Sequence, residues 1–129
     1  MMKPEIKQKW IDALATATYK QGKEVLRNKN DEFCCLGVLC DIYSKETGVG
    51  WELSDDVSET MEIEGCISYL PIKVMNWAGL ESNAPIVEIE GMGDVIQFVG
   101  NEDMIPLTWV NDRLNYTFSQ IAELIREQL

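Results

Sequence analysis

Apolar residues recur at helical spacing in two segments of the first half of the chain. They predict a helix over residues 4–17, with Pro4 in its first turn, and a buried helix over residues 34–47 that ends before Gly48. Inside the second helix, Gly37 costs about 1 kcal/mol relative to alanine. We therefore expect another stretch of backbone to pass close to Gly37.

The second half of the chain predicts three further helices. A short one follows Pro71 and ends at Gly79, and another begins at Pro106. The last runs to the C-terminus, and Thr117 with Gln120 forms the capping box that starts it.

Between these helices, alternating patterns predict strands. Residues 61–64 and 66–70 suggest one hairpin, and residues 85–90 and 94–99 suggest another around the glycine-containing turn at 91–93.

The order of the elements predicts an α+β fold. We expect a small antiparallel β-sheet with about four to five α-helices packed around it, covering it on one side, in a single globular domain over residues 1–129. A composition of 46% hydrophobic and 26% charged residues fits such a domain. No apolar run is long enough to span a bilayer and no secretion signal opens the chain, so we expect a cytoplasmic protein with no membrane role.

The charge of the chain, −11 in total, is unevenly distributed. Residues 1–30 carry a net charge of +4, whereas residues 31–129 carry −15. This field repels nucleic acid and attracts a basic protein surface, although acids also simply keep a small protein in solution. The acidic residues that we select as candidates for binding a partner are Asp55, Asp56, Glu59 and Glu62.

The four cysteines do not form a recognisable reactive site. Cys34 and Cys35 are adjacent, Cys40 follows five residues later and Cys66 stands alone, so the paired spacing of zinc ligands is missing. The chain has no histidine that would activate a thiol. We expect reduced, buried thiols, no metal and no cofactor, and an enzyme is the least favoured class.

One cluster between the last two predicted helices combines an aromatic ring, amide groups and a cation, which is suited to binding a nucleotide or a peptide. Its members are Trp109, Asn111, Asp112, Arg113, Asn115 and Tyr116. The alternative is structural: Arg113 forms salt bridges with nearby acids and Trp109 fills the core.

The most specific stretch of the chain is residues 33–41, Phe-Cys-Cys-Leu-Gly-Val-Leu-Cys-Asp. Together with Trp10, the Leu-Pro and Trp-Ala-Gly-Leu segments of residues 70–80, and residues 111–125, it resembles a family of small uncharacterised proteins encoded by bacteriophages and prophages. That family has no established activity, so the resemblance implies no catalytic residue. It implies a phage accessory protein that acts in the cytoplasm of a bacterial host.

Two hypotheses follow. The first is a non-catalytic phage or prophage accessory protein that binds a host or phage protein through its acidic surface, in host takeover or against bacterial defence. The alternative is a homo-oligomer that sequesters a small molecule or nucleotide with the 109–116 segment.

Overall fold

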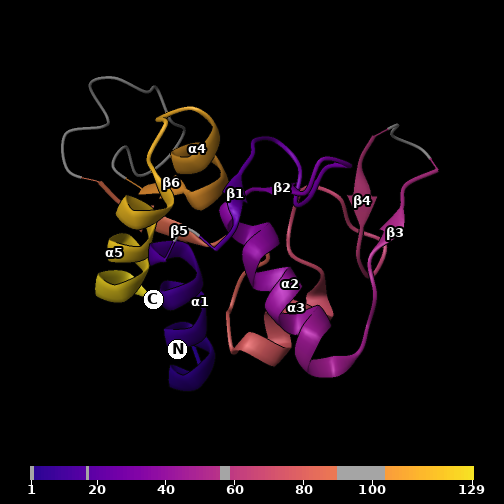
Figure 1. Cartoon of the computed structure of the whole chain (residues 1–129). Coiled ribbons are helices and arrows are strands. Elements are labelled where there is room, and N and C mark those ends of the chain that lie inside the picture. Colours follow the sequence, from indigo (N-terminus) through magenta and orange to yellow (C-terminus); the bar gives the residue numbers. More distant parts are fainter. Residues whose placement is uncertain (1, 17, 56–58, 90–103) are drawn as a thin grey trace.

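The computed structural model describes residues 2–16, 18–55, 59–89 and 104–129, and it confirms the α+β class (Figure 1). Its helices are α1 (Pro4–Ala15), α2 (Cys35–Thr47), α3 (Ile72–Ala78), α4 (Leu107–Asp112) and α5 (Phe118–Gln128). All five lie where the sequence predicts helices, although α1 ends at Ala15. Gly48 ends α2 with a φ of 82°, and the capping box of Thr117 and Gln120 starts α5. None of the helices in these ranges combines the length and apolar composition needed to cross a membrane.

The strands of the described residues form three separate two-stranded pairs rather than one continuous sheet. They are β1 (Lys20–Gln21) parallel to β2 (Glu32–Phe33), β3 (Glu52–Leu53) antiparallel to β4 (Met61–Glu62), and β5 (Ile86–Glu88) antiparallel to β6 (Met104–Pro106). The expected strand at 66–70 is reduced to a single bridge between Ile63 and Cys66. The expected strand at 94–99 lies outside the described residues.

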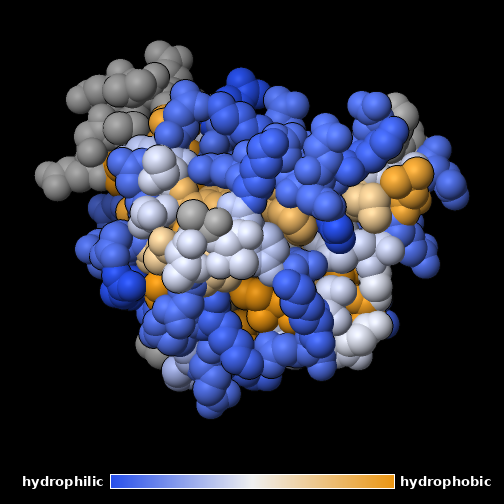
Figure 2. Space-filling model, in the orientation of Figure 1, coloured by the Kyte–Doolittle hydropathy of each residue, from blue (hydrophilic) through white to orange (hydrophobic). Residues whose placement is uncertain are grey.

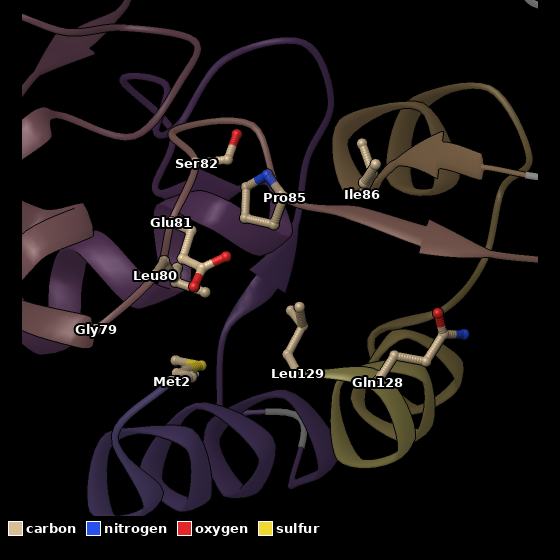
Figure 3. Close-up of a pocket in the computed structure, with 9 residues that line it drawn as sticks. All are labelled: Met2, Gly79, Leu80, Glu81, Ser82, Pro85, Ile86, Gln128 and Leu129. Atoms are coloured by element: carbon tan, nitrogen blue, oxygen red, sulfur yellow. The ribbon is translucent and has the colours of Figure 1, made fainter. Parts of the chain in front are cut away.

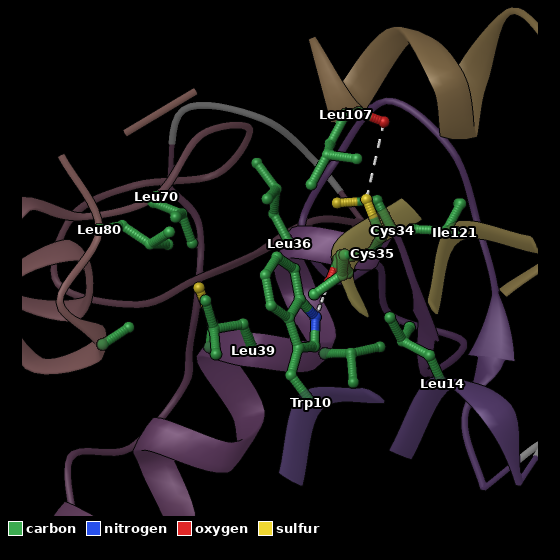
Figure 4. Packing of buried hydrophobic residues seen from close by; sticks show 14 of the residues in the cluster. Trp10, Leu14, Cys34, Cys35, Leu36, Leu39, Leu70, Leu80, Leu107 and Ile121 are labelled. Atoms are coloured by element: carbon green, nitrogen blue, oxygen red, sulfur yellow. Dashed lines mark hydrogen bonds between the residues drawn. The ribbon is translucent and has the colours of Figure 1, made fainter. Parts of the chain in front are cut away.

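The core lies around α2, which contacts α1, α3 and α4, while α1 packs along α5. The indole Nε1 of Trp10 donates a hydrogen bond to the carbonyl of Cys35 at 2.9 Å, and the Cys35 thiol lies 3.7 Å from the carbonyl of Leu107 (Figure 4). Cys34, Cys35 and Cys40 are buried as free thiols. Burial raises the pKa of all three thiols, that of Cys34 to about 12. The thiols therefore stay protonated at neutral pH and behave as small apolar side chains.

Gly37 lies directly against another backbone segment, as its position inside α2 predicts. A Cβ atom built on Gly37 would lie 1.7 Å from the carbonyl oxygen of Leu26. The same carbonyl accepts from the amide of Cys34 at 3.3 Å, and the amide of Leu26 donates to Ile67 at 2.7 Å. The chain at Leu26 is thus held between the start of α2 and the segment around Ile67.

The β3–β4 hairpin is attached to the same crossing segment. The amide of Met61 donates to the carbonyl of Arg27 at 2.9 Å, and the amide of Lys29 donates to Glu59 at 2.8 Å. One edge of β4 is therefore covered. Leu53 on β3 is 61% exposed, because β3 lies at the outer edge of this pair.

Asp41, the last residue of the cysteine-rich stretch, is buried and joins three segments of the chain. Its carboxylate accepts from the Tyr19 hydroxyl at 2.6 Å and from the Trp51 indole at 3.1 Å, and it pairs with the Lys45 ammonium at 3.2 Å. These partners compensate for the desolvation of the carboxylate.

We predict that Gly37→Ala lowers the free energy of unfolding by about 3 kcal/mol or more, because the new methyl group displaces a backbone carbonyl that cannot rotate away. Urea denaturation measures the change. Gly50→Ala is the matched control, since a Cβ there meets no atom within 4 Å. A Gly37→Ala protein as stable as the control would contradict the crossing.

We also predict that stability falls as the pH rises above about 9, because the thiols of the unfolded chain ionise first while the buried Cys34 keeps its proton up to about pH 12. Below pH 9 both states hold the proton, so this group then causes no change. Each such thiol contributes a slope of about 1.4 kcal/mol per pH unit. In urea titrations at several pH values, Cys34→Ala should show a shallower decline, and an unchanged slope would refute the assignment.

Candidate functional site

The acidic residues selected from the sequence lie on and around the β3–β4 hairpin. Asp55 and Glu59 are exposed near its end, Glu62 lies on β4, and Asp56 falls outside the described residues. Glu59 is 3.9 Å from the ammonium of Lys29. Figure 2 shows hydrophilic side chains over most of the visible face, with some hydrophobic surface near this hairpin.

Two carboxylates face each other across the hairpin. Glu52 on β3 is the direct cross-strand partner of Glu62 on β4, and within the described ranges neither forms an ion pair. Like charges at such positions destabilise a strand pair by roughly 0.2–1 kcal/mol. Together with Glu64 they line an acidic pocket of about 240 Å³, so three carboxylates surround one small concavity.

A second pocket, of about 510 Å³, begins at the same Glu64. Apolar side chains form much of its lining: Tyr69 is 50% exposed and Ile72 is 65% exposed, with Pro71 between them. Both pockets include Glu64 in their lining, so they adjoin at this residue. We call this region the acidic–apolar surface, defined by Glu52, Glu62, Glu64, Tyr69, Pro71 and Ile72.

A tight turn positions Glu64 between the two pockets. Glu64 has a φ of 50° and Gly65 a φ of 78°, and the Ile63–Cys66 bridge closes the turn. A glutamate in this left-handed conformation costs about 1 kcal/mol. Its carboxylate lies 3.5 Å from the Lys73 ammonium and accepts from the Tyr43 hydroxyl at 3.4 Å. Burial, followed by the charge of Glu64, raises the pKa of Tyr43.

The structure divides the cluster predicted at 109–116. Trp109, Asp112 and Arg113 line a pocket of about 330 Å³, which also includes Thr108, Glu24, Ser68 and Cys34. We call it the α4 pocket. The Arg113 guanidinium carbon lies 5.5 Å from the centroid of the Trp109 ring, and Trp109 is 37% exposed. Trp109 therefore does not fill the core, and no ion pair of Arg113 is found in the described part of the chain.

Asn111 and Tyr116 belong to a different place. The side chain of Asn111 is fully buried, and its amide donates to the carbonyl of Gly22 at 2.9 Å and to Asp112 at 2.8 Å. Gln21 donates both to Asn111 and to the carbonyl of Tyr116. Asn111 thus connects α4 to the segment after β1 and is a structural residue in this arrangement.

Sequence reasoning did not select Tyr69, Ile72, Glu24 or Ser68. Exposed apolar residues give no local signal in a sequence, and Glu24 and Ser68 reach the α4 pocket from segments far from α4. Among the described residues, no group of three or more His, Cys, Asp or Glu side chains is placed to hold a metal ion.

A further pocket, of about 290 Å³, lies between the start of the chain, the end of α5 and the segment before β5 (Figure 3). Met2, Leu80, Pro85, Ile86 and Leu129 surround it, and Figure 3 shows these side chains around one hollow. The Gln128 amide bonds both backbone groups of Glu88 and so covers the edge of β5 there. None of the residues selected from the sequence lines this pocket.

Almost the whole chain matches one known protein family. Residues 2–129 match a family described as a domain of unknown function, DUF8296, and the chain belongs to it. No curated protein and no solved structure matches the chain.

Proposed function

We propose that this member of the DUF8296 family is a non-catalytic binding protein that holds a basic and apolar segment of another protein on its acidic–apolar surface. The observation that carries the proposal is that two pockets share Glu64 as a lining residue, one lined by three carboxylates and the other by exposed apolar side chains. A partner segment with Lys or Arg beside apolar residues matches both halves.

The acidic half supports the charge of this partner. Strand register fixes Glu52 opposite Glu62. Together with Glu64 they outnumber Lys73, the only cation among the described residues that line either pocket. A cationic side chain placed between Glu52 and Glu62 removes their mutual repulsion. Binding thereby converts an unfavourable interaction of the free protein into a favourable one of the complex.

The apolar half supplies affinity that rim charges alone do not give. Tyr69 and Ile72 are large, exposed and next to each other around one pocket, which is the composition typical of the centre of a protein interface. The charges therefore orient the partner and accelerate its approach, and the apolar contact slows its dissociation.

The resemblance of residues 33–41 to small phage and prophage proteins supports a phage or prophage context. This context remains part of the proposal. The alternative of a nucleotide-sequestering oligomer has less support, because Glu24 and Asp112 bring two carboxylates to the α4 pocket and would repel phosphates. The absence of histidine from the sequence favours binding over catalysis.

The test compares partners captured from the bacterial host by the intact protein and by Glu52→Gln/Glu62→Gln. The double substitution keeps the shape of the hairpin and removes the repulsion, so the variant stays folded. We expect the affinity of a captured partner to fall at least tenfold, or about 1.4 kcal/mol, and to weaken with salt. Titration of the purified partner, by calorimetry, measures the affinity.

Glu123→Gln/Glu127→Gln is the matched control, because it removes the same charge from α5, at the opposite end of the molecule from the hairpin (Figure 1). Ile72→Ser tests the apolar half separately. A partner that binds all of these variants equally and without regard to salt would contradict the proposal. The proposal would also be contradicted if the Glu52→Gln/Glu62→Gln variant captured every protein that the intact chain captures.

A further inference from the structure

We propose that the α4 pocket binds a small zwitterion, namely a free α-amino acid or a dipeptide. The carboxylate of the ligand would pair with Arg113, and its ammonium group would pair with Asp112 and Glu24. This site is separate from the acidic–apolar surface, with which it shares no residue.

Opposite charges line the α4 pocket without neutralising each other. Arg113 lies beside two carboxylates of the same lining, yet no carboxylate of the described residues comes within 4.0 Å of its guanidinium nitrogens. Asp112 accepts a hydrogen bond only from the neutral amide of Asn111 among the described contacts, and Glu24 forms no ion pair there. A ligand with both charges satisfies the two sides together.

The charged groups Arg113 and Asp112 are held in position before a ligand arrives. The contact of the Arg113 guanidinium carbon with the Trp109 ring, 5.5 Å from its centroid, restricts the guanidinium. The fork of N–H donors on a guanidinium matches the geometry of a planar carboxylate. Asn111 bonds both Asp112 and the carbonyl of Gly22, which fixes the Asp112 side chain against the segment that carries Glu24. Such preorganisation reduces the entropy lost on binding.

The remaining lining is neutral and suits the same ligand. Ser68 and Thr108 contribute hydroxyl groups, which both donate and accept hydrogen bonds. The Cys34 thiol is protonated and adds no charge. A volume of about 330 Å³ is near the lower limit of ligand pockets and accommodates an amino acid or a dipeptide.

Ligands with one kind of charge fit the lining less well. An anion such as a nucleotide places its phosphates beside Glu24 and Asp112, and a simple cation leaves Arg113 without a partner. Only a ligand with both charges matches a lining that carries one cation and two carboxylates.

The experiment is an NMR titration of the full chain with four related probes. L-alanine and L-alanyl-L-alanine are zwitterions, whereas L-alaninamide carries only the ammonium group and N-acetyl-L-alanine carries only the carboxylate. We expect the zwitterions to shift the indole N–H signal of Trp109, assigned with Trp109→Phe, in a saturable way. Each single-charge probe should bind at least tenfold more weakly, and the tighter zwitterion identifies the length of the ligand.

Variants separate the two charges. Arg113→Gln should weaken binding of both zwitterions at least tenfold, and Asp112→Asn, which keeps the oxygen that accepts from Asn111, should weaken it as well. Arg126→Gln removes an exposed arginine on α5 and should change nothing. Glu52→Gln/Glu62→Gln should also leave this binding intact, so the two proposals fail independently. Single-charge probes that bind as tightly as L-alanine, or no saturable shift at tens of millimolar, would overturn the assignment.

Discussion

The close approach of the Leu26 carbonyl to Gly37 is the constraint on which the rest of the structure depends. A helix has a diameter that its side chains set, and only glycine lets a second backbone come this near to the axis. The carbonyl then reaches the amide of Cys34, at the start of α2, while the amide of Leu26 bonds Ile67. The chain before Leu26 carries Glu24 to the α4 pocket, and the chain after it supports β4. One crossing therefore positions parts of both proposed binding surfaces.

The composition of the stretch around Gly37 is better explained by the small volume and low polarity of its side chains than by a reactive site. Its cysteines are small enough to pack where two backbones and α4 meet, and burial keeps the thiols protonated. Asp41 closes the stretch with the opposite property. Burying a carboxylate costs free energy unless hydrogen bonds and an opposite charge compensate for the lost water. Asp41 has such partners in Lys45 on α2 and in Tyr19 and Trp51 outside α2. Through Trp51, Asp41 fixes the point where the chain enters β3, so this core carboxylate also orients the acidic–apolar surface.

The sequence predicts the helices well because their signals are local: periodicity, Pro4, Gly48 and the Thr117 capping box all act within a few residues. Strand pairing is a non-local property, and pairs of two or three residues leave little alternation to detect. The same difference applies to the sites. Acids adjacent in sequence are found together on the hairpin, whereas Ser68 reaches the α4 pocket from a distant segment. Asn111 has the composition of a ligand-binding residue, and only its complete burial shows that it holds the fold.

The acidic–apolar surface and the α4 pocket both contain more carboxylates than cations, but they match ligands of different charge. On the hairpin, strand register holds Glu52 against Glu62, and the result is a site that attracts a cation. In the α4 pocket, carboxylates and Arg113 line the same concavity without pairing, and the result is a site that matches both signs. Exposed charges contribute little to stability, since an exposed ion pair is worth at most about 1 kcal/mol. The buried residues around α2 must therefore stabilise the fold, and the rigid core leaves the surface charges in arrangements that a flexible chain would relax by pairing.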